Sequence, residues 1–184
     1  MLRFAFLAVV ITAVWISALY LADYVANNSM AQNLVGQFGY LGILVIAIIS
    51  GVNILVPVPA ASFVPIFTAA GLWLPIIILM LVVGTTIADL IGYLIGQWSR
   101  EFAQEHYPRT YKKVVSLNEN HHRLLIPFVF VYAALVPFPN EAILIPLALI
   151  GIRFHAILIP LILGNIINQT ALAYGATNIF ALVF

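Results

Sequence analysis

Apolar residues occur along the chain in long blocks separated by shorter polar stretches. Three of these blocks cover residues 4–22, 75–97 and 154–175. Each is close to the roughly 20 residues that an α-helix needs to cross a bilayer, so we predict three transmembrane helices. The first block is longer than the about 7–15 apolar residues of a signal peptide, which favours an uncleaved helix.

Two further apolar blocks, residues 38–72 and 126–150, each carry a Pro-x-Pro sequence near the middle. Proline removes a backbone donor and clashes with the preceding helical turn, so the helix should break there and the chain should reverse. Broken backbone at membrane depth is tolerated only where protein or a watery cavity covers it. We therefore predict two re-entrant hairpins whose tips lie beside a functional cavity. The tip prolines are Pro57, Pro59, Pro137 and Pro139.

The distribution of charge predicts the orientation in the membrane. Residues 98–123 contain five of the seven basic residues. Short loops rich in Lys and Arg face the cytoplasm, so this linker and the N-terminus with Arg3 are placed inside, and the C-terminus outside. Aromatic residues among the charges of the linker indicate an amphipathic segment on the membrane surface. The polar residues 23–37 predict a loop or a short interfacial helix.

The second half of the chain repeats the first. A shift of 80 positions superimposes the two Pro-x-Pro sequences without a gap, and also Gly71 on Gly151 and Gly84 on Gly164. Each repeat is a hairpin followed by a transmembrane helix, and the orientation above makes the two repeats opposite. The predicted fold is an all-α polytopic membrane protein with two inverted repeats after an N-terminal transmembrane helix. Inverted repeats with broken helices are typical of secondary transporters.

Composition narrows the function classes. Hydrophobic residues make up 64% of the chain and charged residues 7%, which is too apolar for a water-soluble core. The net charge of +1 offers no basic surface for nucleic acid. The absence of cysteine excludes disulfides and thiolate metal sites. His106, His121 and His122 have no acidic residues at ligand spacing around them, so we expect no metal and no cofactor.

Glu141 is the strongest candidate for a functional residue. A carboxylate in the middle of an apolar block is costly and normally marks an ion or proton pathway. Glu141 follows Asn140 directly after the second Pro-x-Pro sequence. A structural alternative is that Asn140 caps a half-helix and that Glu141 interacts with the positive end of the helix dipole.

Other polar residues in the apolar helices are weaker candidates. Asp89 either belongs to the same pathway or pairs with a basic residue near the cytoplasmic boundary. Asn165, Asn168 and Gln169 occupy the matching part of the last helix and either line the pathway or form hydrogen bonds between helices. Arg153 is either an anchor at the cytoplasmic boundary or a contact for a lipid phosphate.

The first hairpin and the helix after it resemble the DedA proteins, also called the VTT or SNARE-associated Golgi protein superfamily. Val56-Pro57-Val58-Pro59 is followed by Ala69-Ala70-Gly71, and Gly84 to Gly96 is similar to the family pattern G-x-x-x-x-D-x-x-x-Y-x-x-G. The resemblance covers about residues 38–174. It implies two re-entrant hairpins that meet in the bilayer and an activity in moving lipids, polyprenyl phosphate in bacterial members and phospholipids in eukaryotic relatives. Bacterial members usually place an arginine near the second tip, where this chain has Asn140 and Glu141.

The leading hypothesis is a lipid-moving transporter of the cell membrane, proton-coupled through Glu141 and Asp89, with membrane lipids as its partners. The acidic residues and the missing arginine keep a proton-linked exporter of small cations open, and a non-transporting assembly factor is a further alternative. An intramembrane hydrolase is disfavoured, because aspartyl chemistry needs two apposed carboxylates and serine chemistry needs a base, for which Ser62 has only His155 as an intramembrane histidine. A homodimer would help so small a chain to enclose its hairpins, and the spacing of Gly92 and Gly96 permits close helix contact.

Overall fold

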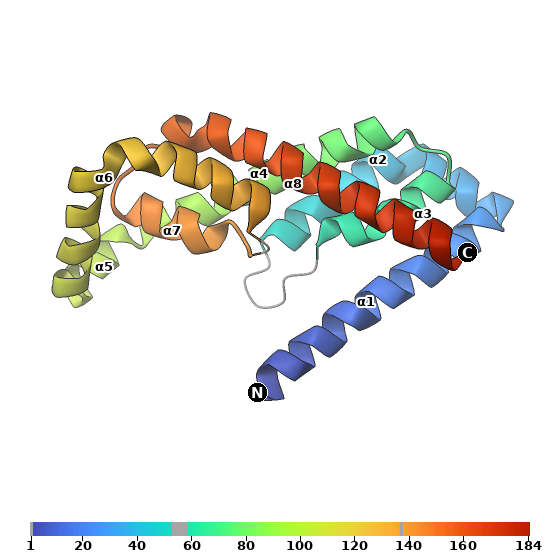
Figure 1. Ribbon diagram of the computed structural model, residues 1–184, viewed down its shortest axis with the longest axis horizontal. Helices are drawn as coiled ribbons and strands as arrows, with labels where there is room; N and C mark the ends of the chain where they lie inside the picture. The colour runs from blue at the N-terminus through green and yellow to red at the C-terminus, as the bar shows by residue number, and fades with distance from the viewer. Residues whose placement is uncertain (1, 53–58, 137) are drawn as a thin grey trace. The chain divides into compact units, whose positions relative to one another are not determined.

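The computed structural model of the chain describes residues 2–52, 59–136 and 138–184. Within these ranges, only the backbone is described for residues 2–8, 109–110 and 112–123. The described part of the chain is all α-helical apart from one 3-10 turn and the connecting segments, and it has no strand (Figure 1). The elements are α1 (Leu2–Ala26), α2 (Ser29–Gly51), the 3-10 turn η1 (Ala60–Phe63), α3 (Val64–Ala69), α4 (Leu74–Trp98), α5 (Arg100–His106), α6 (Pro108–Leu135), α7 (Glu141–Leu149) and α8 (Phe154–Val183).

Four helical stretches are long and apolar enough to cross a membrane: Val9–Ala26, Ser29–Gly51, Leu74–His106 and Phe154–Val183. Large apolar side chains project outward along them. On α2 these side chains are Leu34, Phe38, Leu41, Val45 and Ile49. Such continuous exposed apolar surface is stable against lipid but not against water. The chain is therefore a membrane protein.

The polar stretch at residues 23–37 is helical except at Asn27 and Asn28. The side chain of Asn28 accepts a hydrogen bond from the backbone N–H of Ala31 at 3.0 Å and so caps the start of α2. The Gln32 side chain donates to the last carbonyl of α1, that of Ala26, at 2.8 Å. Because both helix ends are satisfied locally, the loop predicted here shrinks to a two-residue turn, and α2 begins well before the predicted hairpin.

The predicted linker at 98–123 is mostly helical. After the short helix α5, α6 begins with Pro108 in its first turn and continues through Pro127 to Leu135 without a break. Helix α6 therefore runs from the predicted linker at 98–123 into the apolar block at 126–150. A change from polar to apolar residues does not by itself end a helix, because no backbone hydrogen bond is lost there.

The second proline of each Pro-x-Pro sequence lies outside the α-helices. Pro59 directly precedes η1, and Pro139 lies between α6 and α7. The backbone N–H of Ser62 donates to the Pro59 carbonyl at 3.0 Å, and that of Ala142 donates to the Pro139 carbonyl at 3.1 Å. The other tip prolines, Pro57 and Pro137, lie outside the described residues.

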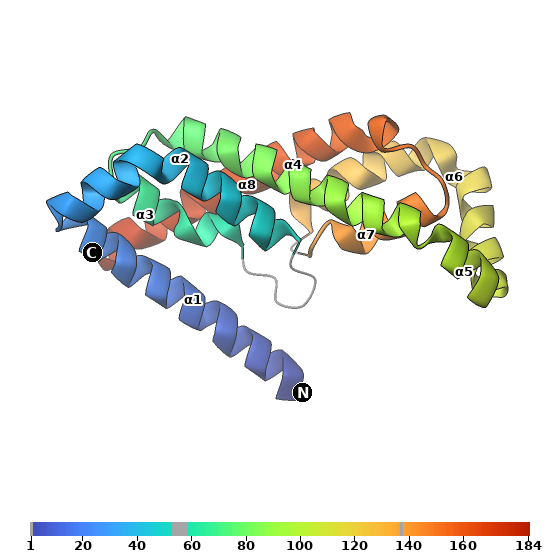
Figure 2. The ribbon, with the colours of Figure 1, turned by 180° about the vertical axis from the view of Figure 1, so that it is seen from behind.

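The chain divides into two compact units. Unit 1 comprises Met1–Thr85 and Gln169–Phe184, and unit 2 comprises Thr86–Asn168. The division falls inside α4 and inside α8, so each of these long helices supplies one part to each unit. Helices α1, α2 and α3 belong to unit 1, and α5, α6 and α7 to unit 2 (Figure 2).

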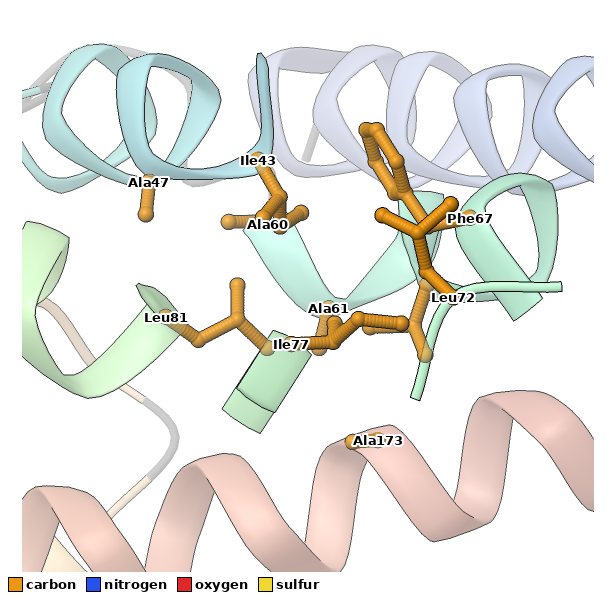
Figure 3. Close-up of a cluster of buried hydrophobic side chains, with 10 residues drawn as sticks. Ile43, Ala47, Ala60, Ala61, Phe67, Leu72, Ile77, Leu81 and Ala173 are labelled. Atoms are coloured by element: carbon orange, nitrogen blue, oxygen red, sulfur yellow. The ribbon is translucent and has the colours of Figure 1, made fainter. Parts of the chain in front are cut away.

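Each unit has its own apolar core. In unit 1, α2 and η1–α3 pack against the first part of α4, and Ala173 of α8 completes the cluster (Figure 3). In unit 2, α6 and α7 pack against the first part of α8. The core of unit 1 includes Ile43, Ala47, Val64, Phe67, Ile77 and Leu81. The core of unit 2 includes Val129, Ala133, Leu144, Leu147, Ile157 and Leu161.

Two glycines allow the closest helix contacts in these cores. A Cβ atom on Gly84 would lie 2.5 Å from the Ala47 Cβ and 2.9 Å from the Leu44 carbonyl oxygen. A Cβ atom on Gly164 would lie 2.6 Å from the Ala133 Cβ and 2.9 Å from a backbone carbonyl oxygen of α6. At both positions the missing side chain is what lets the two helix backbones touch.

The helices after the two interruptions end in the same way. Gly71 after α3 has φ 83° and Gly151 after α7 has φ 85°, values that favour glycine. The backbone N–H of Leu72 donates to the Phe67 carbonyl at 3.1 Å, and that of Ile152 donates to the Leu147 carbonyl at 3.1 Å. These bonds define a Schellman cap at each end, and each cap leads directly into a long helix.

Candidate functional site

The polar residues of unit 2 converge on the carboxylate of Asp89. Asn165 of α8 donates a hydrogen bond to Asp89 Oδ2 at 2.7 Å, and Asn140 donates to the same oxygen at 3.2 Å. Asn140 also donates to Asn165 Oδ1 at 3.0 Å. Asp89 and Asn165 are buried, with 3% of each residue exposed. Three segments that are distant in sequence, α4, the second hairpin and α8, therefore share one hydrogen-bonded site.

The direction of these hydrogen bonds is fixed by the chemistry of the groups. A carboxylate oxygen that receives two N–H groups carries no proton itself. The amide nitrogens of Asn140 and Asn165 must therefore both face Asp89, which leaves the oxygen of Asn165 for the remaining N–H of Asn140. The two amides thus hold Asp89 as a hydrogen-bond acceptor at Oδ2.

Glu141 lies next to this trio, with 3% of its surface exposed. Its side chain packs on Gly92, where a Cβ atom would lie 2.6 Å from the Glu141 Cγ. Gly92 is three residues after Asp89 and so on the same face of α4. Glu141 Oε1 has no hydrogen-bond partner among the described residues. An unsatisfied buried carboxyl oxygen is costly unless a proton, water or ligand reaches it.

The structural alternative for Asn140 was that its side chain caps the following half-helix, and this capping bond is not formed. Asn140 directly precedes α7, but its side chain makes no capping hydrogen bond to the first turn of that helix. It bonds instead to Asp89 and Asn165, which belong to other helices. The alternative for Asp89, pairing with a basic residue, is also not what the described side chains do, because Asp89 is held by the two amides.

The remaining candidates do not join the trio. Asn168 donates to the Ala134 carbonyl at 3.3 Å, near the end of α6, which is the interhelical role proposed as its alternative. Gln169 is buried and its Oε1 has no described partner, but it belongs to unit 1. Arg153 is exposed immediately before α8. Ser62 Oγ, in unit 1, is buried without a hydrogen-bond partner in the described part of the chain.

Two residues at the site were not singled out as part of it by the sequence. Gly92 was noted only for a close helix contact, and that contact is made inside the chain: Gly92 meets Glu141, and Gly96 meets Ile145 of α7. Tyr132 donates a hydrogen bond to the Pro139 carbonyl at 3.4 Å and so holds the backbone before Asn140. A lone tyrosine in an apolar block gives no sequence signal for this contact.

A second polar cluster lies where α5 meets α6. Arg100 Nε donates to the Tyr111 hydroxyl at 3.1 Å, and Gln104 Nε2 donates to the same hydroxyl at 2.8 Å. These two hydrogen bonds stabilise the ionised form and lower the pKa of Tyr111 below its usual value of 10.0. The two terminal nitrogens of Arg100 lie over Gly151, each 3.1 Å from where a Cβ atom would be.

The arrangement around Asp89 can bind a proton or another small group with positive character. Asp89 and Glu141 are both buried, and the side chains that hydrogen-bond to Asp89 are amides. Buried carboxyl groups exchange protons or bind cations more readily than they bind anions. The described residues contain no group of three or more His, Cys, Asp or Glu side chains that could hold a metal ion.

Comparison with protein-family models, with curated protein sequences and with solved structures gives no match for this chain.

Proposed function

We propose that the chain is a membrane transporter that moves lipids, of the DedA/VTT type, with Glu141 and Asp89 as its proton-binding groups. The observation that carries the proposal is the buried site of unit 2, where two amides hold the carboxyl group of Asp89 and Glu141 is buried next to Asn140. Buried ionisable groups between apolar helices are costly, and they commonly mark substrate or proton pathways in membrane proteins.

The likeness of the two units supports an architecture of two repeats, each with a proline-broken hairpin. The glycines at the close contacts (Gly84 and Gly164), the glycines of the caps (Gly71 and Gly151) and core residues of the following helices (Ile77 and Leu81, Ile157 and Leu161) correspond under the 80-residue shift. The charge distribution favours opposite orientations for the repeats. Transporters with inverted repeats place substrate and ion sites at interrupted helices, which is where Asn140 and Glu141 lie.

A comparison with unit 1 tests whether Asn140 and Glu141 are needed for packing. At the positions of Asn140 and Glu141, shifted by 80, unit 1 has Ala60 and Ala61. Both alanines are buried in a core that is otherwise built like that of unit 2. A hairpin of this kind therefore packs without an amide and a carboxyl group, so a requirement of folding does not account for Asn140 and Glu141.

The test is lipid movement in proteoliposomes, with fluorescent phospholipid and polyprenyl-phosphate reporters, at several pH values. Wild-type protein is compared with Glu141→Gln, which keeps the size of the side chain and removes its titration. We expect movement of at least one lipid class that depends on pH and is reduced about tenfold or more in the variant. Lipid movement by neither protein would contradict the proposal, and equal movement by both would leave Glu141 without a role in it.

A second candidate function is a proton-linked exporter of small cations. It is favoured by one observation: no basic side chain bonds to Asp89 or Glu141 in the described part of unit 2, whereas a phosphate-bearing substrate would be repelled by ionised carboxylates. Cation-dependent pH changes inside protein-containing vesicles, lost in Glu141→Gln, would favour this function over lipid transport. In a non-transporting assembly factor, Glu141→Gln would leave function unchanged.

A further inference from the structure

The guanidinium group of Arg100 is held in place but is only partly used. Its Nε is bound to Tyr111, and Tyr111 is held in turn by Gln104. The two terminal nitrogens have no hydrogen-bond partner among the described residues. An arginine fixed at Nε loses little further side-chain freedom when its terminal N–H groups bind a ligand.

The position of this group is set by Gly151. Its positive φ ends α7, and its missing side chain leaves room for the Arg100 nitrogens. Arg153 follows two residues later and is exposed, as Arg100 is. Two arginines from different elements, one on α5 and one just before α8, are thus placed around the same turn of unit 2.

The turn itself does not need these charges. The last carbonyls of α7 that a cation would stabilise are used by backbone N–H groups: Pro146 and Ala148 accept from Ile150 and Gly151, and Leu147 accepts from Ile152. The Schellman cap therefore satisfies most of this helix end. The terminal nitrogens of Arg100 remain available for an external acceptor.

We propose that Arg100 and Arg153 form a binding site for the phosphate group of a membrane lipid at the turn between α7 and α8. Arginine binds phosphate through two parallel N–H groups, and the free nitrogens of Arg100 offer such a pair. Exposed aromatic side chains of the same region, Trp98, Phe102 and Tyr107, suit the interface between lipid chains and headgroups. The occupant is an anionic lipid, because the same surface then contacts both the acyl region and the phosphate.

This site is separate from the carboxyl site and its test does not require transport. Purified protein in phosphatidylcholine nanodiscs is mixed with phosphatidylglycerol, and bound phosphatidylglycerol is counted by native mass spectrometry after release. We expect Arg100→Gln and Arg153→Gln each to reduce the retained phosphatidylglycerol by about five- to tenfold. Tyr111→Phe keeps the charge but loses the bond to Nε, and a loss of about twofold is expected.

The matched control is Arg109→Gln, which removes one positive charge from the same linker. It should change retention by less than about twofold if binding is site-specific, because a diffuse charge effect would be shared by all the linker cations. Equal losses in Arg109→Gln and Arg100→Gln would overturn the proposal. Displacement of the lipid by millimolar inorganic phosphate would overturn the lipid assignment and indicate a site for free phosphate. Elution of each variant as the wild type in size-exclusion chromatography shows that it is folded.

Discussion

The two units use the same packing but carry different chemistry. Ile77 and Leu81 of unit 1 match Ile157 and Leu161 of unit 2, and all four side chains are buried in their cores. The polar positions do not match. Where unit 2 has Asp89, Asn140, Glu141 and Asn165, unit 1 has Gln169, Ala60, Ala61 and Thr85.

The difference distinguishes the residues that packing requires from the residues that form the polar site. The residues shared by the units are those that fill the cores, permit close helix contact and end the helices after each interruption. The residues that differ are those that form the carboxyl site. In unit 1, Thr85 bonds to the backbone of its own helix, accepted by the Leu81 carbonyl at 2.9 Å, and makes no network like that of Asn165.

The strongest test of the shared packing is to fill the glycine contacts. Gly84→Val and Gly164→Val would each drive side-chain atoms into the facing helix, where backbone atoms cannot move away. We expect each to destabilise the protein by about 3 kcal/mol or more, and to reduce the yield of folded protein. Thermal unfolding in detergent, followed by size-exclusion fluorescence, measures the effect.

Gly175→Val is the control for this experiment, because nothing lies within 4 Å of a Cβ atom there. It lies in a helix like the other two glycines, so its effect on helix propensity is comparable. If only one of the two contact variants is destabilised, the equivalence of the two packings is lost. If Gly175→Val is equally damaging, the effect is not one of contact.

The second test makes the chemistry of unit 2 like that of unit 1. The double variant Asn140→Ala/Glu141→Ala copies Ala60 and Ala61, and we expect the protein to remain folded because unit 1 packs with these residues. Lipid movement in proteoliposomes should fall by about a hundredfold, equivalent to roughly 2.7 kcal/mol of activation free energy. A folded double variant with wild-type activity would remove the functional role from both residues.

The third test concerns the hydrogen bond that holds Asp89. Asn165→Thr introduces the residue found at position 85 and removes the 2.7 Å bond to Asp89 Oδ2. We expect a loss of about 1–2 kcal/mol of stability, because a buried acceptor is left with one donor fewer. The control at the matching position of unit 1, Thr85→Ser, keeps a hydroxyl and should be close to neutral. Chemical denaturation in mixed micelles compares the two variants, and equal effects would show that the bond contributes little.

Much of the fold could be predicted from the sequence. The apolar blocks predicted the long helices, and Pro59 and Pro139 both lie between helices in the described part of the chain. Helix boundaries that depend on side-chain caps were missed. Asn28 starts α2 early because its side chain replaces a lost backbone acceptor, and neither an isolated Asn-Asn pair nor composition reveals that geometry.

The site could be predicted only as separate residues. Glu141, Asp89 and Asn165 were singled out because polar groups in apolar blocks are costly. That Asn140 would bond across to Asp89, 51 positions away, depends on how α7 packs against α4. The packing follows from Gly92 and Gly96, whose pattern predicted a close contact but not the partner helix. In the same way, sequence gave no sign that Arg100 would lie over Gly151.

The smallest effects should come from Gly71→Ala and Gly151→Ala, which place a side chain at a positive φ. Each should cost about 1 kcal/mol, because alanine in this conformation brings its Cβ close to the following carbonyl. The thermal shifts should be similar, since Gly71 has no neighbour within 4 Å and only the end of the exposed Arg100 side chain lies near Gly151. Phosphatidylglycerol retention should separate them: it should fall in Gly151→Ala, where Arg100 is displaced, and stay unchanged in Gly71→Ala. Equal phosphatidylglycerol retention in both variants would mean that the position of Arg100 over Gly151 does not contribute to lipid binding.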